Sequence, residues 1–356
     1  MPETTSTKLG YADDWALAHQ SKDWAELESV LSEDTMILKT FFDRWYLKMN
    51  TSKSVSTVFH LDNKQAQRPL RVRVNDKFLP PDRSPKYLGI TLDRTLTYKE
   101  HLECTARKIS KRNCMMRKIA GTSWGAKQTV LRTTGLALCY SVAEYCAPVW
   151  SRSAHSRLVD VKLRETMRVV SGCLKSTPKE WLPVCSAMAP PHLRRNEINQ
   201  GWLNKIKQTE EETPLKVIFD RAPTTNRLKS RKPFRHSVQE QPNLLESWRK
   251  EWHENTPRGG DMIADPTTSL PGFHTASRKV WVTANRIRTR HGRTQSNLHR
   301  WGISESPICP RCLKTEQNTD HLITHCPVTR LPGGYVTANL CDEDLANWIQ
   351  THKMEL

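Results

Sequence analysis

The chain has 356 residues, 55 Lys and Arg against 37 Asp and Glu, and a formal net charge of +18, and this length predicts two or three folded units rather than one. No stretch has the roughly 18 apolar residues that a membrane helix needs, and the first residues carry no apolar secretion signal, so we expect an intracellular protein, nuclear or cytoplasmic, with no membrane partner. The positive excess favours polyanionic partners such as nucleic acid, with ordinary solubility as the alternative.

The first 95 residues predict a small α+β unit. Alternating apolar residues on both sides of a turn at residues 12–14 predict a β-hairpin. Asp23 then begins a long amphipathic helix, which we expect to end near Asn50 in a left-handed cap. Further strands are expected at residues 55–61, at residues 70–79 as a hairpin, and at residues 87–92.

The apolar spacing becomes helical from about residue 97. Helices are expected over residues 97–120, 126–148, 155–173, 191–208, 244–252 and 280–288. The sequence therefore predicts an α+β fold class in which mostly helical segments follow the strands. Its four predicted segments are residues 1–95, a helical segment at 96–208, a polar linker at 209–270 and a basic tail at 271–356.

Two adjacent carboxylates occupy the tip of the first predicted hairpin, in the run Tyr11-Ala12-Asp13-Asp14. Hard divalent cations prefer oxygen ligands, so Asp13 is a candidate ligand for Mg²⁺ or Mn²⁺. Two such metals support phosphoryl or nucleotidyl transfer. An Asp-Asp pair in a turn is common, however, and by itself it predicts no metal site.

This run, with Gly10 before it, resembles the active-site hairpin of reverse transcriptases. Residues 47–53 (LKMNTSK) resemble the lysine-bearing motif that follows in that family, and residues 87–93 (YLGITLD) resemble the primer-grip region of non-LTR retrotransposon polymerases. Residues 285–293 and 298–302 resemble the C-terminal tail of jockey-like elements. The resemblance implies a partial reverse-transcriptase palm, a helical thumb or connection, and a zinc-bearing tail.

The resemblance also implies roles for individual residues. Asp13 would be a metal ligand, Asp14 would share or tune that metal, and Lys53 would lie near the phosphates of the incoming nucleotide. Leu88 and Gly89 would lie at the 3′ end of the primer. An exposed turn lysine and an ordinary strand end are the alternatives for the last three residues.

One requirement of the family's site is missing from this sequence. A further carboxylate is needed on an upstream strand, and the only acid before Asp13 is Glu3. The resemblance therefore implies the C-terminal portion of the RNA-directed DNA polymerase of a mobile element, inactive alone and able to associate with the missing N-terminal part. The alternatives are a non-catalytic, zinc-dependent RNA- or DNA-binding protein and a decayed element copy without a selected function.

A cysteine and histidine cluster lies near the end of the chain. Two cysteines two residues apart place both thiolates on one face of a tetrahedron, and a histidine and a third cysteine complete a Cys3His zinc set. Asp320 is a candidate to orient the histidine, His325 is an alternative fourth ligand, and buried free thiols are the alternative to zinc. The predicted Zn²⁺ ligands are Cys309, Cys312, His321 and Cys326.

Three stretches are basic and contain no Asp or Glu: residues 104–143 with eight Lys and Arg, 221–239 with six, and 266–304 with seven. Such stretches suit contact with phosphates, so RNA and DNA, as template and primer, are the expected partners. Trp281 and Trp301 could stack on bases, with core tryptophans as the alternative. The candidate nucleic-acid contacts are Arg107, Lys108, Lys111, Arg286, Arg288 and Arg293.

Overall fold

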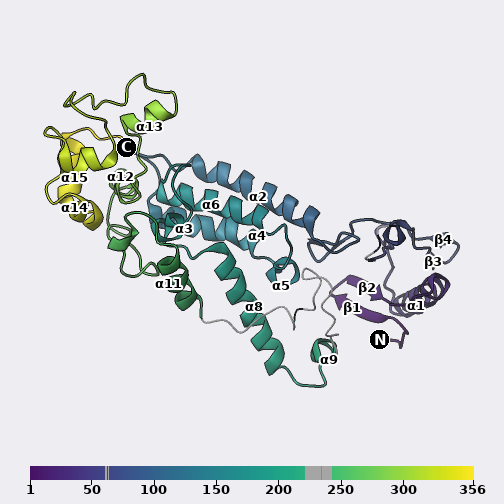
Figure 1. Cartoon of the computed structure of the whole chain (residues 1–356). Helices are drawn as coiled ribbons and strands as arrows, with labels where there is room; N and C mark the ends of the chain where they lie inside the picture. Colours follow the sequence, from purple (N-terminus) through teal and green to yellow (C-terminus); the bar gives the residue numbers. More distant parts are fainter. Residues whose placement is uncertain (61, 63, 221–233, 235–242) are drawn as a thin grey trace. The chain divides into compact units, whose positions relative to one another are not determined.

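The computed structural model describes residues 1–60, 62, 64–220, 234 and 243–356, and its helices and short strands form an α+β mixture (Figure 1). These residues divide into two units, Met1–His101 and Leu102–Leu356. No helix of the described residues is both long and apolar enough to cross a membrane.

The first unit begins with the predicted hairpin. Strands β1 (Thr7–Tyr11) and β2 (Asp14–Ala18) are antiparallel, and Gly10 lies opposite Trp15. A Cβ atom at Gly10 would lie 2.5 Å from the indole of Trp15, so glycine lets this ring lie across the neighbouring strand. Ala12 and Asp13 form the two-residue turn, with Ala12 at a φ of +52°.

Helix α1 (Trp24–Arg44) follows, capped by the Asp23 carboxylate, which accepts a hydrogen bond from the Ala25 N–H. The helix ends before the expected Asn50, because Tyr46 takes the left-handed conformation at a φ of +56°. The Tyr46 N–H donates to the Asp43 carbonyl and the Leu47 N–H donates to the Phe42 carbonyl. These two bonds are a Schellman motif, so the expected cap at Asn50 is wrong.

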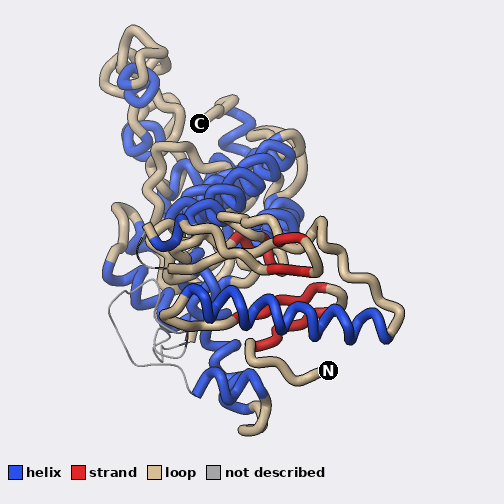
Figure 2. Tube along the Cα trace, turned by 90° about the vertical axis from the view of Figure 1, so that its right-hand side faces the viewer, coloured by secondary structure: helices blue, strands red, loops and turns tan. Residues whose placement is uncertain are grey.

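Two further hairpins complete the strands of this unit, and Figure 2 shows them as short paired segments. They are formed by β3 (Arg73–Val74) with β4 (Lys77–Phe78), and by β5 (Lys86–Tyr87) with β6 (Ile90–Thr91). The first matches the hairpin expected at 70–79, whereas the single strand expected at 87–92 is instead a hairpin. The core of the unit packs one face of α1 against the segment that holds β3 and β4, through Leu31, Leu70, Val72, Val74 and Leu79.

The strand expected at residues 55–61 is absent over residues 55–60, and residue 61 lies outside the described part. Ser56 forms an isolated bridge with Pro81. Because Pro80 and Pro81 have no N–H to donate, the pairing does not extend into a ladder. The β-branched composition of this stretch therefore produces a single bridge and no strand over residues 55–60.

The second unit is helical, as expected. Gly135 allows close packing of α3 on α6, because a Cβ atom there would lie 3.0 Å from the Thr166 methyl group. The region expected as one helix over 126–148 is divided by a π-helix, Leu136–Tyr140. The helices are α2 (Lys99–Arg117), α3 (Gln128–Gly135), α4 (Ser141–Ala143), α5 (Ala147–Trp150), α6 (Arg157–Ser171), α7 (Trp181–Ser186), α8 (Pro191–Gln208), α9 (Pro214–Asp220), α11 (Leu244–Glu254), α12 (Arg278–Arg288), α13 (Gln295–Arg300), α14 (Tyr335–Leu340) and α15 (Glu343–Thr351).

Candidate metal and nucleic-acid sites

The carboxylate hairpin presents both acids to solvent. Asp13 lies in the turn and Asp14 begins β2, and both side chains are exposed. Among the described residues, the one group of three or more convergent metal-ligand side chains is the Cys/His cluster, so the two aspartates have no third ligand there. This arrangement supplies part of a cation site and leaves the remaining coordination open.

The tip of the β5–β6 hairpin is tied to the carboxylate hairpin. The Tyr87 hydroxyl donates to the Leu9 carbonyl at 3.3 Å. Leu88 and Gly89 are the two turn residues, at φ values of +44° and +83°. Positive φ at both positions is typical of a type I′ turn, in which glycine is unstrained and leucine is strained.

Lys53 lies in a separate turn after α1. The Asn50 side-chain and main-chain oxygens accept hydrogen bonds from the Lys53 N–H, each at 3.2 Å. The Lys53 side chain is exposed, and within the described residues no hydrogen bond or ion pair joins it to Asp13 or Asp14. The role predicted for Lys53 therefore stays a prediction.

The Cys/His cluster is a compact donor set. The ligand atoms of Cys309, Cys312, His321 and Cys326 all lie within 4.8 Å of one another. A tetrahedral zinc ion with Zn–S bonds of about 2.3 Å needs neighbouring donors about 3.8 Å apart, so the set fits zinc.

Local backbone structure positions these four residues. The Cys309 N–H donates to the Thr315 carbonyl and the Leu313 N–H donates to the Cys309 carbonyl, each at 2.8 Å, which closes the knuckle. A π-helix over His321–His325 separates the last two ligands, and the Cys326 N–H donates to the His321 carbonyl at 2.7 Å. The wide π turn brings both side chains to the same side.

The structure distinguishes the two candidate histidines. His321 Nε2 lies 3.4 Å from the Cys312 sulfur, whereas His325 is exposed and outside the donor group. His321 Nδ1 lies 3.0 Å from the Thr315 hydroxyl, which leaves Nε2 for a metal. Thr315 therefore takes the orienting position that the sequence suggested for Asp320, and no sequence signal identified it.

Asp320 has other partners. Its carboxylate accepts a hydrogen bond from the Tyr335 hydroxyl at 2.5 Å and pairs with Arg290 at 3.3 Å. Burial and this neighbouring carboxylate raise the pKa of Tyr335. The Asp320 carboxylate therefore links the start of the π-helix to α14, and among the described residues it forms no hydrogen bond to a predicted zinc ligand.

The protonation states of the donor set suit a metal. Burial, with a smaller effect from His325, lowers the pKa of His321, which favours the neutral imidazole that a metal ligand requires. Burial raises the pKa of Cys326, but hydrogen bonds from Thr329 and from the Val328 N–H lower it more, so the net pKa is below the ordinary value of a thiol. A lowered pKa favours the thiolate.

The arginines of α12 are buried, which corrects the prediction that Arg286 and Arg288 contact nucleic acid. Only 6% of Arg286 and 5% of Arg288 is exposed. Arg288 donates to the Asn339 and Pro271 carbonyls. Trp281 is also buried, and Arg288 lies over its ring at 5.3 Å, so Trp281 is a core residue.

These side chains cap the carboxyl end of α6. Arg278 donates to the carbonyls of Val169 and Val170. The neighbouring contacts on α12 come from Asn285 to the Ser171 carbonyl and from Arg286 to the Gly172 carbonyl. A helix leaves its last four carbonyls without internal partners, and cations are favourable at that end. The basic stretch thus performs a structural task that its charge pattern did not reveal.

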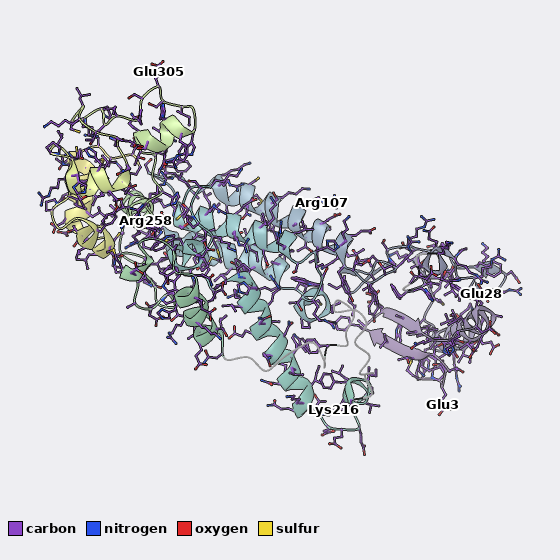
Figure 3. The ribbon with its side chains drawn as sticks, in the orientation of Figure 1. Glu3, Glu28, Arg107, Lys216, Arg258 and Glu305 are labelled. Carbon is purple, nitrogen blue, oxygen red and sulfur yellow. The ribbon has the colours of Figure 1, made fainter. Side chains whose placement is uncertain are left out.

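Other predicted contacts remain on the surface. Arg293 is exposed, and so are Arg107, Lys108 and Lys111 on α2, where Arg107 lies at the outer edge of the helix (Figure 3). Within the described residues none of these four forms an ion pair, so their charges are available to phosphates. The basic stretch at 221–239 lies, apart from residue 234, outside the described residues.

Comparisons with known proteins agree with this geometry. The model of a family described as zinc-binding in reverse transcriptase matches residues 272–331, which include all four donors. The chain is 30% identical over 171 residues to the probable RNA-directed DNA polymerase from transposon BS of Drosophila melanogaster. The chain is therefore similar to the RNA-directed DNA polymerases of non-LTR retrotransposons.

Other relatives of this polymerase group match almost the whole chain. The R1 Pol polyprotein of Bradysia coprophila is 21% identical over 90% of the chain, and an R1 Pol polyprotein of Nasonia vitripennis is 23% identical over 89% of it. The chain spans 18% of the length of the transposon BS protein, 31% of the Bradysia protein and 77% of the Nasonia protein. No solved structure matches the chain. These matches confirm the resemblance to non-LTR retrotransposon polymerases with a zinc-binding tail.

Proposed function

We propose that these residues are the part of a non-LTR reverse transcriptase that begins at its metal-binding hairpin, continues through a nucleic-acid-binding helical unit and ends in a zinc-binding tail. Its substrates would be RNA and DNA, as template and primer. The observation that carries the proposal is the convergent Cys3His set inside a segment that matches the zinc-binding family of reverse transcriptases.

The catalytic part of the proposal concerns the first hairpin. Asp13 would bind Mg²⁺, Asp14 would share or tune it, and Leu88 and Gly89 would lie beside the primer through the tie between Tyr87 and β1. When bound, such metals neutralise charge that develops during nucleotidyl transfer. Lys53, on its Asn50-held turn, would lie near the nucleotide phosphates.

The carboxylates of the same hairpin are the reason why we expect this chain by itself to be catalytically inactive. Two-metal sites need more carboxylates than Asp13 and Asp14 supply, and the described residues bring no third one to them. The remaining ligand would come from another part of the polymerase. The second candidate function is a zinc-dependent binder of RNA or DNA without catalysis. It is favoured because the zinc donor set is complete whereas the carboxylate set is incomplete.

One experiment tests both candidates. The purified chain, with zinc, is mixed with an RNA template annealed to a DNA primer, and both binding and dNTP incorporation with Mg²⁺ are measured. We expect binding that weakens steeply with salt and no incorporation. Incorporation that Asp13→Asn abolishes would contradict the inactivity, and salt-independent or absent binding would contradict both functions.

A further inference from the structure

A short loop after α2 holds an exposed tryptophan in a fixed position. The Ala126 N–H donates to the Ile119 carbonyl at 2.9 Å, and Ala120 and Gly125 form an antiparallel bridge. Gly125 has a φ of +98°, which glycine adopts without strain. The loop is therefore closed at its base, and Trp124, directly before the bridged Gly125, has 62% of its surface exposed.

One face of the Trp124 ring rests on the backbone of the same loop. A Cβ atom built on Gly121 would lie 2.5 Å from Nε1, 2.6 Å from Cε2 and 2.7 Å from Cδ1 of the indole. Nearly equal distances to three consecutive ring atoms place Gly121 over the face of the five-membered ring. The Gly121 carbonyl in turn accepts a hydrogen bond from buried Arg278 at 3.1 Å. The ring is thus supported from below by anchored backbone and open on the other side.

A row of cations on α2 leads to this loop. Lys108 and Lys111 lie three residues apart on one side of α2, Lys118 follows in the turn directly after the helix, and all three are exposed. From Lys108 to the end of α2 at Arg117 the helix extends about 14 Å, the length of a few nucleotides. Residues 104–143 contain no Asp or Glu, so no acid of this stretch opposes a phosphate backbone.

The arginines of the same stretch that do have partners are used elsewhere. Arg117 pairs with Glu165 at 3.4 Å, and Arg132 donates to the Ala187 carbonyl at 2.7 Å. Among the described residues, the exposed cations of α2 and of the turn after it that form no such contact are Arg107, Lys108, Lys111 and Lys118. An exposed aromatic face next to a cationic track is the arrangement by which proteins hold single-stranded nucleic acid.

We propose that Trp124 is a stacking platform for an unpaired base of an RNA or DNA strand whose phosphates follow the cationic side of α2. This inference rests on the proposed nucleic-acid binding by the helical unit and adds to it a residue and a strand type: an unpaired segment, such as a template overhang, and not the paired region. Stacking uses the face of a base, so RNA and DNA strands bind alike.

The test uses the full zinc-loaded chain and fluorescence anisotropy with three labelled probes: an unstructured single-stranded RNA, the DNA of the same sequence and a blunt duplex. Trp124→Ala and Trp124→Leu lower affinity for both single strands by about 5- to 100-fold, the range that one stacked base contributes, and leave the duplex unchanged. Trp124→Phe retains most of the affinity. Trp202→Ala is the matched control, because Trp202 is an exposed tryptophan on another helix, α8, with 48% of its surface exposed. This control variant binds all three probes as the unmodified chain does.

A lysine variant distinguishes the contribution of charge to binding from the contribution of stacking. The double variant Lys108→Glu with Lys111→Glu weakens binding to all probes and reduces its salt dependence, whereas Trp124→Ala leaves the salt dependence unchanged. Normal single-strand binding by Trp124→Ala, with weak binding by the lysine variant, overturns the stacking proposal and leaves the proposed function standing. Equal loss on duplex and single strands by Trp124→Ala also overturns it. Normal binding by both variants overturns the proposed function of α2 itself.

Discussion

At the scale of single residues, the contribution of an arginine depends on whether its guanidinium is buried. Arg286 is buried and donates to the main-chain oxygens of Gly172 and Leu356, whereas Arg293 is exposed. Arg286→Met leaves these oxygens without this donor, so we expect a loss of about 2–4 kcal/mol in the free energy of unfolding. Arg293→Met changes that free energy by less than about 0.5 kcal/mol, but lowers the salt slope of RNA binding by about 1.

Urea denaturation and salt-titrated binding of the two variants check this pair of expectations. Similar stability losses in both variants would contradict the separation of structural from surface arginines. A normal melting curve for Arg286→Met combined with weakened RNA binding would restore the role that the sequence suggested for Arg286.

Asp93 is a second residue whose effect depends on its contacts. Burial raises the pKa of Asp93, but hydrogen bonds from the Thr97 hydroxyl and N–H and from the Tyr98 N–H lower it more, so its pKa is below the ordinary value. A lowered folded-state pKa stabilises the protein above the unfolded-state pKa of about 3.9, and this contribution is lost as the pH falls through the folded-state value.

We therefore expect Asp93→Asn to be less stable than the unmodified chain at pH 7 and the difference to shrink as the pH is lowered below about 4. The free energy of unfolding, measured in urea across this range, is the readout. Asp76→Asn, at an exposed position in the β3–β4 turn, is the control and should show little pH-dependent difference. A constant difference for Asp93→Asn at all pH values would contradict the explanation.

At the scale of elements, helix α1 ends through a tyrosine where glycine is usual. Tyr46 is 98% exposed and left-handed, so its side chain gains no packing to offset the strain. We expect Tyr46→Gly to raise the free energy of unfolding by about 0.5–1 kcal/mol, because glycine removes that strain. Tyr46→Ala keeps the Cβ atom and should give no such gain in the same urea titration. An equal gain in both variants would show that the ring, and not the backbone, is the cause.

At the scale of the whole molecule, the zinc set and the first hairpin belong to different units, Leu102–Leu356 and Met1–His101. Removal of the metal should therefore act locally. With a strong chelator, we expect amide hydrogen exchange to rise over residues 309–326 and to stay unchanged over residues 7–18. His321→Ala should reproduce this pattern without chelator, and exposed His325→Ala should not. Faster exchange in both units, or in neither, would contradict a local structural zinc site.

Local sequence patterns determined much of this protein. Adjacent residues form the turn at Ala12 and Asp13, Asp23 caps the helix that follows it, and the four zinc donors lie within residues 309–326, so short-range geometry was sufficient to predict each of them. The confirmed family resemblance likewise depends on contiguous motifs. Such features need no knowledge of what lies across the core.

Only the tertiary structure determined the features that depend on contacts between residues far apart in the sequence. Whether Arg286 meets solvent depends on the packing of α12 against the end of α6, more than one hundred positions earlier in the chain. The choice between His321 and His325 depends on a π-helix that turns one ring toward the cysteines and leaves the other in solvent. The strand expected at 55–61 had suitable residues but only a proline-limited partner. The burial of a side chain and the pairing of a strand each depend on two segments, so the sequence of one segment does not determine them.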